Sequence, residues 1–161
     1  MRLRSQVEHA VLCCLLMIGL KENESLSTKS MATLYDLPKG YLAKALQALS
    51  RAGIIAGSHG IFGGYRLCRD PDAIMLLEIV EALEGPFSTF KQSTSAARLL
   101  VGAVPGVGSR LATPCTAADS QWRDVLHTRS LNRLAFEIGL SQEKIGEMRH
   151  RAIAACAERD Q

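Results

Sequence analysis

The sequence predicts a mainly α-helical chain with one small β-wing, and signals between Ser27 and Leu67 carry this prediction. A short helix is expected to begin at Ser27 or Thr28, and Pro38 opens a second helix that ends just before Gly53. Two short apolar segments then flank a glycine-rich tip, which is typical of a β-hairpin. Helix, short turn, helix and two-stranded ribbon is the order found in a winged helix-turn-helix, which places one helix in a DNA groove.

Positive charge is concentrated on the half of the chain that contains this motif, although the net charge of the 161 residues is only +3. Residues 1–70 hold nine Lys and Arg against five Asp and Glu, whereas the remainder holds ten against eleven. Contact with nucleic-acid phosphates would require such an excess. The apolar content of 47% is ample for a hydrophobic core.

Composition favours a cytoplasmic protein that crosses no membrane. The apolar run from Ala10 to Leu20 is about half the length of a membrane-spanning helix, and no signal-peptide cleavage site follows it. The five cysteines are odd in number and lack disulfide-framework spacing, which indicates a reduced compartment. Cys13, Cys14 and Cys68 lie in or beside apolar segments, so we expect them in the core.

Residues 3–20 predict a first helix that is apolar on nearly every side. One apolar stripe passes through Val7 and Ile18, and another passes through Leu12 and Leu16. A helix that is apolar all round is expected to be buried all round. In a chain of this length, we expect one face to pack on its own domain and another on a second subunit.

The second helix of the motif has an apolar face at helical spacing and a polar face that is expected to meet DNA. Lys44 and Arg51 can reach phosphates or guanine, Gln47 can pair with adenine, and Tyr41 can donate to a phosphate. The candidate DNA contacts that precede the ribbon in the chain are Arg2, Thr28, Lys39, Gly40, Tyr41, Lys44, Gln47 and Arg51. The alternative is an ordinary solvated helix face.

The wing supplies the remaining candidate DNA contacts. Glycines at 57, 60, 63 and 64 permit a sharp reversal of the chain. Ser58 and His59 lie at this tip, where His59 could touch a minor groove or a phosphate. Tyr65 and Arg66 follow in the second strand, and Arg66 is the stronger candidate for a phosphate contact.

The rest of the chain predicts three helices around one irregular stretch. A short amphipathic helix covers residues 74–84, a long helix covers residues 117–138, and Ser141 is placed to cap a last helix. The expected domains are a winged helix-turn-helix over 1–86, an effector loop over 87–116, and a dimerisation helix with a C-terminal helix over 117–161.

The long helix indicates a homodimer. Because a compact winged domain offers such a helix little surface, we expect it to pair with its symmetry mate and to present two recognition helices to a palindromic DNA site. The residues expected at this contact are Trp122, Val125, Leu126, Leu131, Leu134 and Ile138.

Taken together, the motifs of the helix-turn-helix, the wing and the following helices resemble those of the IscR/NsrR/CymR family of bacterial winged-helix regulators, the Rrf2 superfamily. The shared features are Ala52-Gly53-Ile54-Ile55, Gly63-Gly64-Tyr65-Arg66-Leu67, the Glu84-Gly85-Pro86 helix end and a long helix containing Trp122. The resemblance covers about residues 1–140. It implies a homodimer that binds palindromic promoter DNA, mostly as a repressor, and in many members an iron–sulphur cluster that senses iron, nitric oxide or redox state.

The sequence departs from cluster-bearing relatives in its cysteines. Such relatives usually place three cysteines between the Glu-Gly-Pro end and the long helix, where this chain has Cys115 alone. We therefore expect that the protein binds no cofactor. The alternative is a [2Fe-2S] cluster with mixed ligands, since the resemblance places Glu8 at the position of an acidic ligand from the first helix. Asp119 and His127 are further candidates by their proximity in sequence to Cys115.

The sequence is also compatible with control by means other than a cluster and with a function other than DNA binding. Without a cluster, Cys115 could be a thiol sensor, or control could come from a partner protein or small ligand. The sequence lacks nucleophile-elbow, HExxH, P-loop and CxxC patterns, so no enzyme is expected. The main alternative function is a winged-helix protein-interaction module that does not bind DNA.

Overall fold

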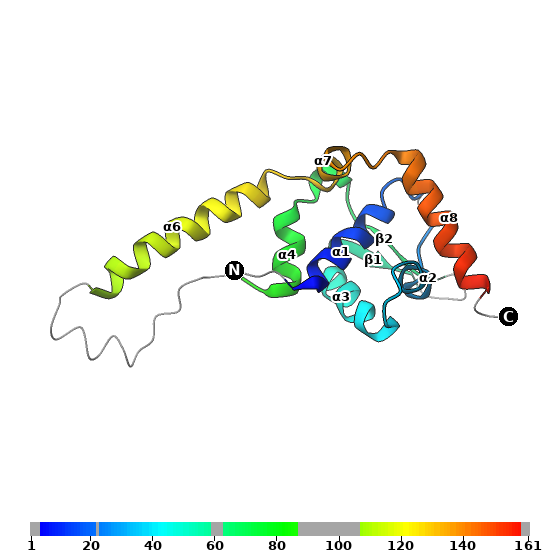
Figure 1. Ribbon diagram of the computed structural model, residues 1–161, viewed down its shortest axis with the longest axis horizontal. Coiled ribbons are helices and arrows are strands. Elements are labelled where there is room, and N and C mark those ends of the chain that lie inside the picture. The colour runs from blue at the N-terminus through cyan, green and yellow to red at the C-terminus, as the bar shows by residue number, and fades with distance from the viewer. Residues whose placement is uncertain (1–3, 22, 59–62, 87–106, 159–161) are drawn as a thin grey trace.

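The computed structural model confirms a mainly α-helical chain with a small two-stranded sheet, and it describes residues 4–21, 23–58, 63–86 and 107–158 (Figure 1). In chain order the elements are α1 (Ser5–Leu16), α2 (Thr28–Leu34), α3 (Lys39–Arg51), β1 (Ile55–Gly57), β2 (Tyr65–Leu67), the 3-10 turn η1 (Pro71–Ala73), α4 (Leu76–Glu84), α6 (Val107–His127), α7 (Leu131–Glu137) and α8 (Gln142–Glu158).

Local signals set the limits of the helix-turn-helix as predicted. The Ser27 hydroxyl accepts a hydrogen bond from the Ser30 amide at 3.0 Å, which satisfies one of the free donors at the start of α2. Pro38 is the N-cap of α3, and Gly53 follows that helix with a φ of +68°. A left-handed φ is readily adopted only by glycine, so Gly53 ends α3 and turns the chain into β1.

The wing is joined by a third segment that the sequence did not indicate. β1 and β2 are antiparallel, with Ala56 opposite Arg66. The Leu26 amide donates to the Tyr65 carbonyl at 3.0 Å, and the Tyr65 amide donates to the Leu26 carbonyl at 2.8 Å. A Cβ on Gly64 would lie 2.6 Å from the Leu26 carbonyl, so only glycine permits this approach. The segment before α2 is thus fixed to the wing.

The first helix is buried inside its own chain. Ala10, Cys13 and Cys14 have no exposed surface, and α1 packs against α3, α4, α7 and α8. Val11 and Leu12 on the same helix are only half-buried, so contact of α1 with a second subunit stays a prediction. The C-terminal helices α7 and α8, whose contact with α1 the sequence did not predict, supply a further apolar surface.

The predicted long helix over 117–138 is two helices. α6 begins at Val107, with Pro114 inside it, and ends at His127. Ser130 interrupts the helical run because its hydroxyl accepts from the Arg133 amide to cap α7, while the Leu131 amide donates to the Ile74 carbonyl. Residues 107–116 of the expected effector loop are consequently helical, and residues 87–106 lie outside the described part.

The two ends of the chain build one body, from which α6 projects (Figure 1). α8 packs on α1 and α2, and Ile145 of α8 and Leu131 of α7 belong to the same buried cluster as Leu46 of α3. The sequence pattern did not predict this packing, and the division into 1–86, 87–116 and 117–161 stays a prediction. Within the described residues, the structure has no helix long and apolar enough to span a membrane.

Candidate nucleic-acid interface

The recognition helix α3 has one buried face and one exposed, basic face. Its buried side chains are Leu42, Ala45, Leu46 and Leu49, each without exposed surface. Its exposed residues include Lys39, Gly40, Lys44, Gln47 and Arg51. No Asp or Glu occurs between Lys39 and Arg51, so the exposed face has only positive and neutral groups.

Two hollows lie where α3 meets the wing and the start of α2. One, of about 400 Å³, is lined by Gln47, Ser50, Arg51 and Tyr65. The other, of about 540 Å³, is lined by Thr28, Ser50, Gly57, Ser58, Gly63, Gly64 and Tyr65. The two hollows share Ser50 and Tyr65, so they adjoin each other at the end of the recognition helix, and together they are termed the groove.

The groove brings together five candidates from α2, α3 and the wing. These residues are Thr28, Gln47, Arg51, Ser58 and Tyr65. Arg66 is exposed on β2, whereas Lys39 and Gly40 lie at the opposite end of α3. Arg2 and His59 lie outside the described residues. The sequence prediction missed Ser50, although its spacing of three from Gln47 on one helix could have identified it.

Four cations of this surface have no ion-pair partner among the described residues. The described ion pairs join Arg4 to Glu84, Arg69 to Glu78, Arg123 to Glu81, and both Arg129 and Arg133 to Glu137. None involves Lys39, Lys44, Arg51 or Arg66. These four groups are therefore available to an anionic partner without breaking an ion pair with a described residue.

Tyr41 differs from its neighbours because it is turned toward the first helix. Its hydroxyl lies 3.4 Å from Nδ1 of His9, and the two rings meet edge to face with centroids 5.8 Å apart. The side chain is only half-buried, so this contact orients Tyr41 without removing it from the surface.

The residues expected at a dimer contact fall into two groups. On the projecting helix α6, Val125 is 59% exposed, and Trp122 and Leu126 are half-buried. On α7, Leu131 is 1% exposed and packs in the core of its own chain, so its side chain is not available to a second subunit. Leu134 is half-buried and Ile138 is 55% exposed just after α7.

The candidate sensor residues lie on different helices. Glu8 is exposed on α1, and Cys115 is half-buried on α6. No three His, Cys, Asp or Glu side chains come together as a metal site in the part of the chain described here. Burial raises the pKa of the Cys13 thiol to about 12, as expected of an unreactive core residue. Cys68 was expected in the core but is exposed, because it follows β2 on the solvent side.

Comparisons with known proteins agree with this architecture. A protein of Synechocystis assigned as an HTH-type transcriptional regulator is 42% identical over 66 residues, which are 41% of this chain and 45% of that protein. The HTH-type transcriptional regulator CymR of Bacillus subtilis is 40% identical over 62 residues, 38% of this chain and 45% of CymR. The chain thus aligns with just under half the length of these relatives.

Solved structures match over more of the chain. The structure of CymR, the global cysteine regulator of B. subtilis, superposes with a TM-score of 0.59 at 23% identity and covers 85% of this chain and 98% of CymR. At that identity the likeness shows the fold. The model of the Rrf2 family, described as iron-dependent transcriptional regulators, matches residues 3–137. The chain therefore belongs to the Rrf2 family of transcriptional regulators.

Proposed function

We propose that this protein is a sequence-specific DNA-binding regulator that acts as a homodimer on a palindromic promoter site, most simply as a repressor. The observation that carries the proposal is the exposed basic face of α3, which continues through the groove at Ser50 and Tyr65 to the wing. Lys44 and Arg51 have no ion-pair partner among the described residues, and charges of this kind bind phosphates by releasing counterions.

The alternative of a winged module for protein contacts has less support from this face. A protein-binding helix would be expected to expose apolar or aromatic anchors. The large apolar side chains of α3 are buried, and those that are most exposed in the described residues, Val125, Phe136, Ile138 and Ile153, lie on or next to α6, α7 and α8.

The dimer is supported by the isolation of α6. This helix of 21 residues extends away from the body, and its anchor to α4 includes the ion pair of Arg123 with Glu81 at 2.6 Å (Figure 1). Trp122, Val125 and Leu126 keep apolar surface exposed on it. Pairing of two such helices would bury this surface and would give the two-fold symmetry that a palindromic site requires.

The proposal includes a signal that controls DNA affinity, which we take to be a redox change or a small ligand. Glu8 and Cys115 belong to no group of three described metal-ligating side chains, so the described part of one chain does not fit a cluster with three protein ligands. We expect protein purified without oxygen to be nearly colourless. A charge-transfer spectrum with stoichiometric iron and sulphide would contradict this expectation.

The test of DNA binding is a salt titration of affinity. Selection of bound sequences from a random duplex pool should yield a palindrome, and fluorescence anisotropy then measures affinity for it. Lys44→Ala and Arg51→Ala should each weaken binding and reduce the magnitude of the salt slope by about one. Arg151→Ala is the matched control, because Arg151 is exposed on α8 rather than on α3. Equal affinity of all four proteins at every salt concentration would overturn the assignment.

A further inference from the structure

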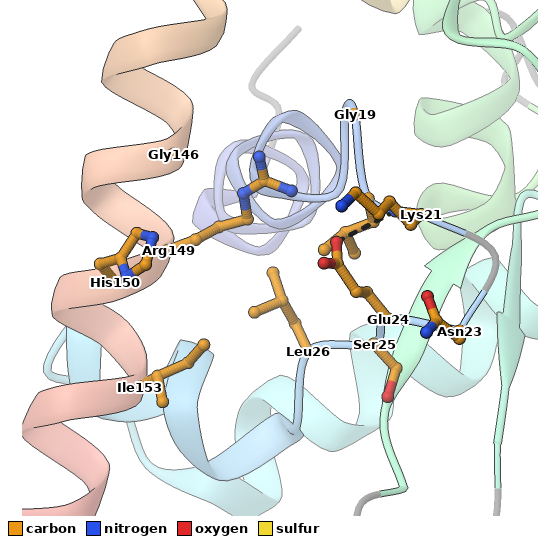
Figure 2. Close-up of a pocket in the computed structure, with 11 residues that line it drawn as sticks. Gly19, Lys21, Asn23, Glu24, Ser25, Leu26, Gly146, Arg149, His150 and Ile153 are labelled. Carbon is orange, nitrogen blue, oxygen red and sulfur yellow. Dashed lines mark hydrogen bonds between the residues drawn. The ribbon is translucent and has the colours of Figure 1, made fainter.

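A cavity of about 460 Å³ lies between α8 and the segment that joins α1 to α2. Figure 2 shows Arg149 and Ile153 reaching into this space from α8, opposite Lys21, Glu24 and Leu26. Its volume is within the range of small-molecule sites, roughly 300–1,000 Å³. α8 begins at Gln142, beyond the residues 3–137 that the family model matches, so one wall of the cavity lies outside that match.

Gly19, in the turn after α1, lies next to the side chain of Gln142 at the start of α8. Gly19 has a φ of +76°, and a Cβ at this position would lie 2.6 Å from Oε1 of Gln142. The left-handed φ favours glycine at this turn, whereas the flexible end of the Gln142 side chain could move away from an added Cβ. The cavity opens below this contact as α8 continues toward α2, on which it also packs.

Among the described residues, the charged groups that line the cavity have a small positive excess. Of the described lining residues, Lys21 and Arg149 carry positive charge, His150 adds an imidazole, and Glu24 supplies a carboxylate. One carboxylate oxygen of Glu24 already has a partner, since its Oε2 accepts a hydrogen bond from the Lys21 amide at 3.0 Å. A site with this balance favours an anion.

Arg149 is the strongest individual indication of a ligand. Its side chain is half-buried and extends across the cavity (Figure 2). The ion pairs and hydrogen bonds between described residues leave its guanidinium without an acceptor, unlike the five arginines that are paired with Glu. A partly desolvated guanidinium is stabilised by an anion, and its planar donor pairs match a carboxylate in particular.

The floor of the cavity is apolar. Leu26 is 1% exposed and Ile153 is 56% exposed, and both side chains lie below Arg149 in Figure 2. A ligand with a carboxylate on Arg149 and a short hydrocarbon body on Leu26 and Ile153 would satisfy both features.

The same segment is connected to both DNA-facing elements. Leu26 exchanges two backbone hydrogen bonds with Tyr65 of the wing, and the next residue, Ser27, caps α2. Ser25 lies within 3.4 Å of the Ser58 hydroxyl at the wing. Displacement of this segment by a ligand would therefore move the groove that includes Thr28, Ser58 and Tyr65.

We propose that this cavity binds a small organic carboxylate with an apolar body, with Arg149 as its principal contact, and that occupancy changes DNA affinity. The second part rests on the proposed function, whereas the first part stands without it.

The binding experiment uses the full chain without DNA. Hexanoate, acetate and inorganic phosphate are titrated while the thermal midpoint is measured, followed by calorimetry with hexanoate. Hexanoate should give a saturable rise in the midpoint and should bind more tightly than acetate or phosphate. Arg149→Gln should weaken hexanoate binding roughly tenfold or more, because a charged hydrogen-bond partner is removed.

Arg151→Gln is the matched control for Arg149→Gln, since it removes the same charge from an exposed position on the same helix. It should bind hexanoate like the unmodified chain, and circular dichroism of each variant verifies folding. Lys21→Gln provides a second variant on the opposite wall. Absence of saturable hexanoate binding, equal binding of phosphate, or equal loss in Arg151→Gln would overturn the site.

The coupling is then measured by anisotropy on the selected operator, with and without saturating hexanoate. A change of at least about fivefold in DNA affinity, absent in Arg149→Gln, is expected of a typical allosteric coupling. Unchanged affinity would overturn the coupling alone. Failure to bind any duplex would refute the proposed function and would leave the cavity measurement intact.

Discussion

The hydroxyl of Tyr41 on the recognition helix lies 3.4 Å from Nδ1 of His9 on the first helix, and their rings meet at 80°. The contact joins a surface residue of α3 to the helix at the centre of the body. It gives Tyr41 a fixed orientation at the edge of the basic face.

Loss of this contact should cost stability. Tyr41→Phe keeps the ring and removes the hydroxyl, so we expect the free energy of unfolding to fall by about 0.5–1.5 kcal/mol. A double-mutant cycle with His9→Ala, followed by urea denaturation, should give a coupling energy of about 0.5–1 kcal/mol. Strictly additive effects would show that the two side chains are neighbours without an interaction.

A side chain at Gly64 should separate the wing from the segment before α2. In Gly64→Ala, the new Cβ would meet the Leu26 carbonyl at 2.6 Å, and overpacking of this kind costs about 1–3 kcal/mol. We expect a thermal midpoint lower by roughly 2–10 °C. Gly146→Ala is the control: nothing lies within 4 Å of its added Cβ, and helix propensity should raise stability by about 0.5–1 kcal/mol. Equal midpoints for both variants would contradict the prediction.

Glu78 should contribute stability that disappears in acid. Burial alone would raise the pKa of its carboxyl, but hydrogen bonds from Arg69 and the Met75 amide, together with the charge of Arg69, lower it below 4.5. Because the folded-state pKa is depressed, the stabilisation is present above the unfolded pKa near 4.5 and is lost as pH falls through the folded value. Glu78→Gln and Arg69→Gln should both flatten the loss of stability below pH 4.5, measured by urea denaturation across pH. A slope unchanged in both variants would exclude this ion pair as its source.

The projecting helix should determine the oligomeric state. Trp122→Ala on α6 should raise the dimer dissociation constant at least about tenfold, since buried tryptophans are common interface anchors. Sedimentation at micromolar protein measures this change. Phe136→Ala removes a side chain that is 85% exposed on α7 and should leave the dimer intact. A Trp122→Ala variant that dimerises as tightly as the unmodified chain would contradict the proposed interface.

Prediction of the groove beside the recognition helix requires both the sequence pattern and the tertiary structure. Gln47 and Arg51 follow from helical periodicity, because residues four apart share a face. Their proximity to Thr28 and Ser58 depends on the pairing of Leu26 with Tyr65, which are 39 positions apart. The pattern of residues before α2 gave no indication of this strand-like contact.

By itself, the sequence determined the helix-turn-helix and its wing, because their limits are local. Ser27 caps α2, and Gly53 ends α3 with a positive φ; both effects act within a few residues. Only the tertiary structure decided what covers α1. Its apolar surface is compatible with a second subunit or with another part of the chain, and α7 and α8, more than 100 residues away, occupy it. Hydrophobic burial is non-directional, so an apolar pattern shows that a face is covered without identifying its partner.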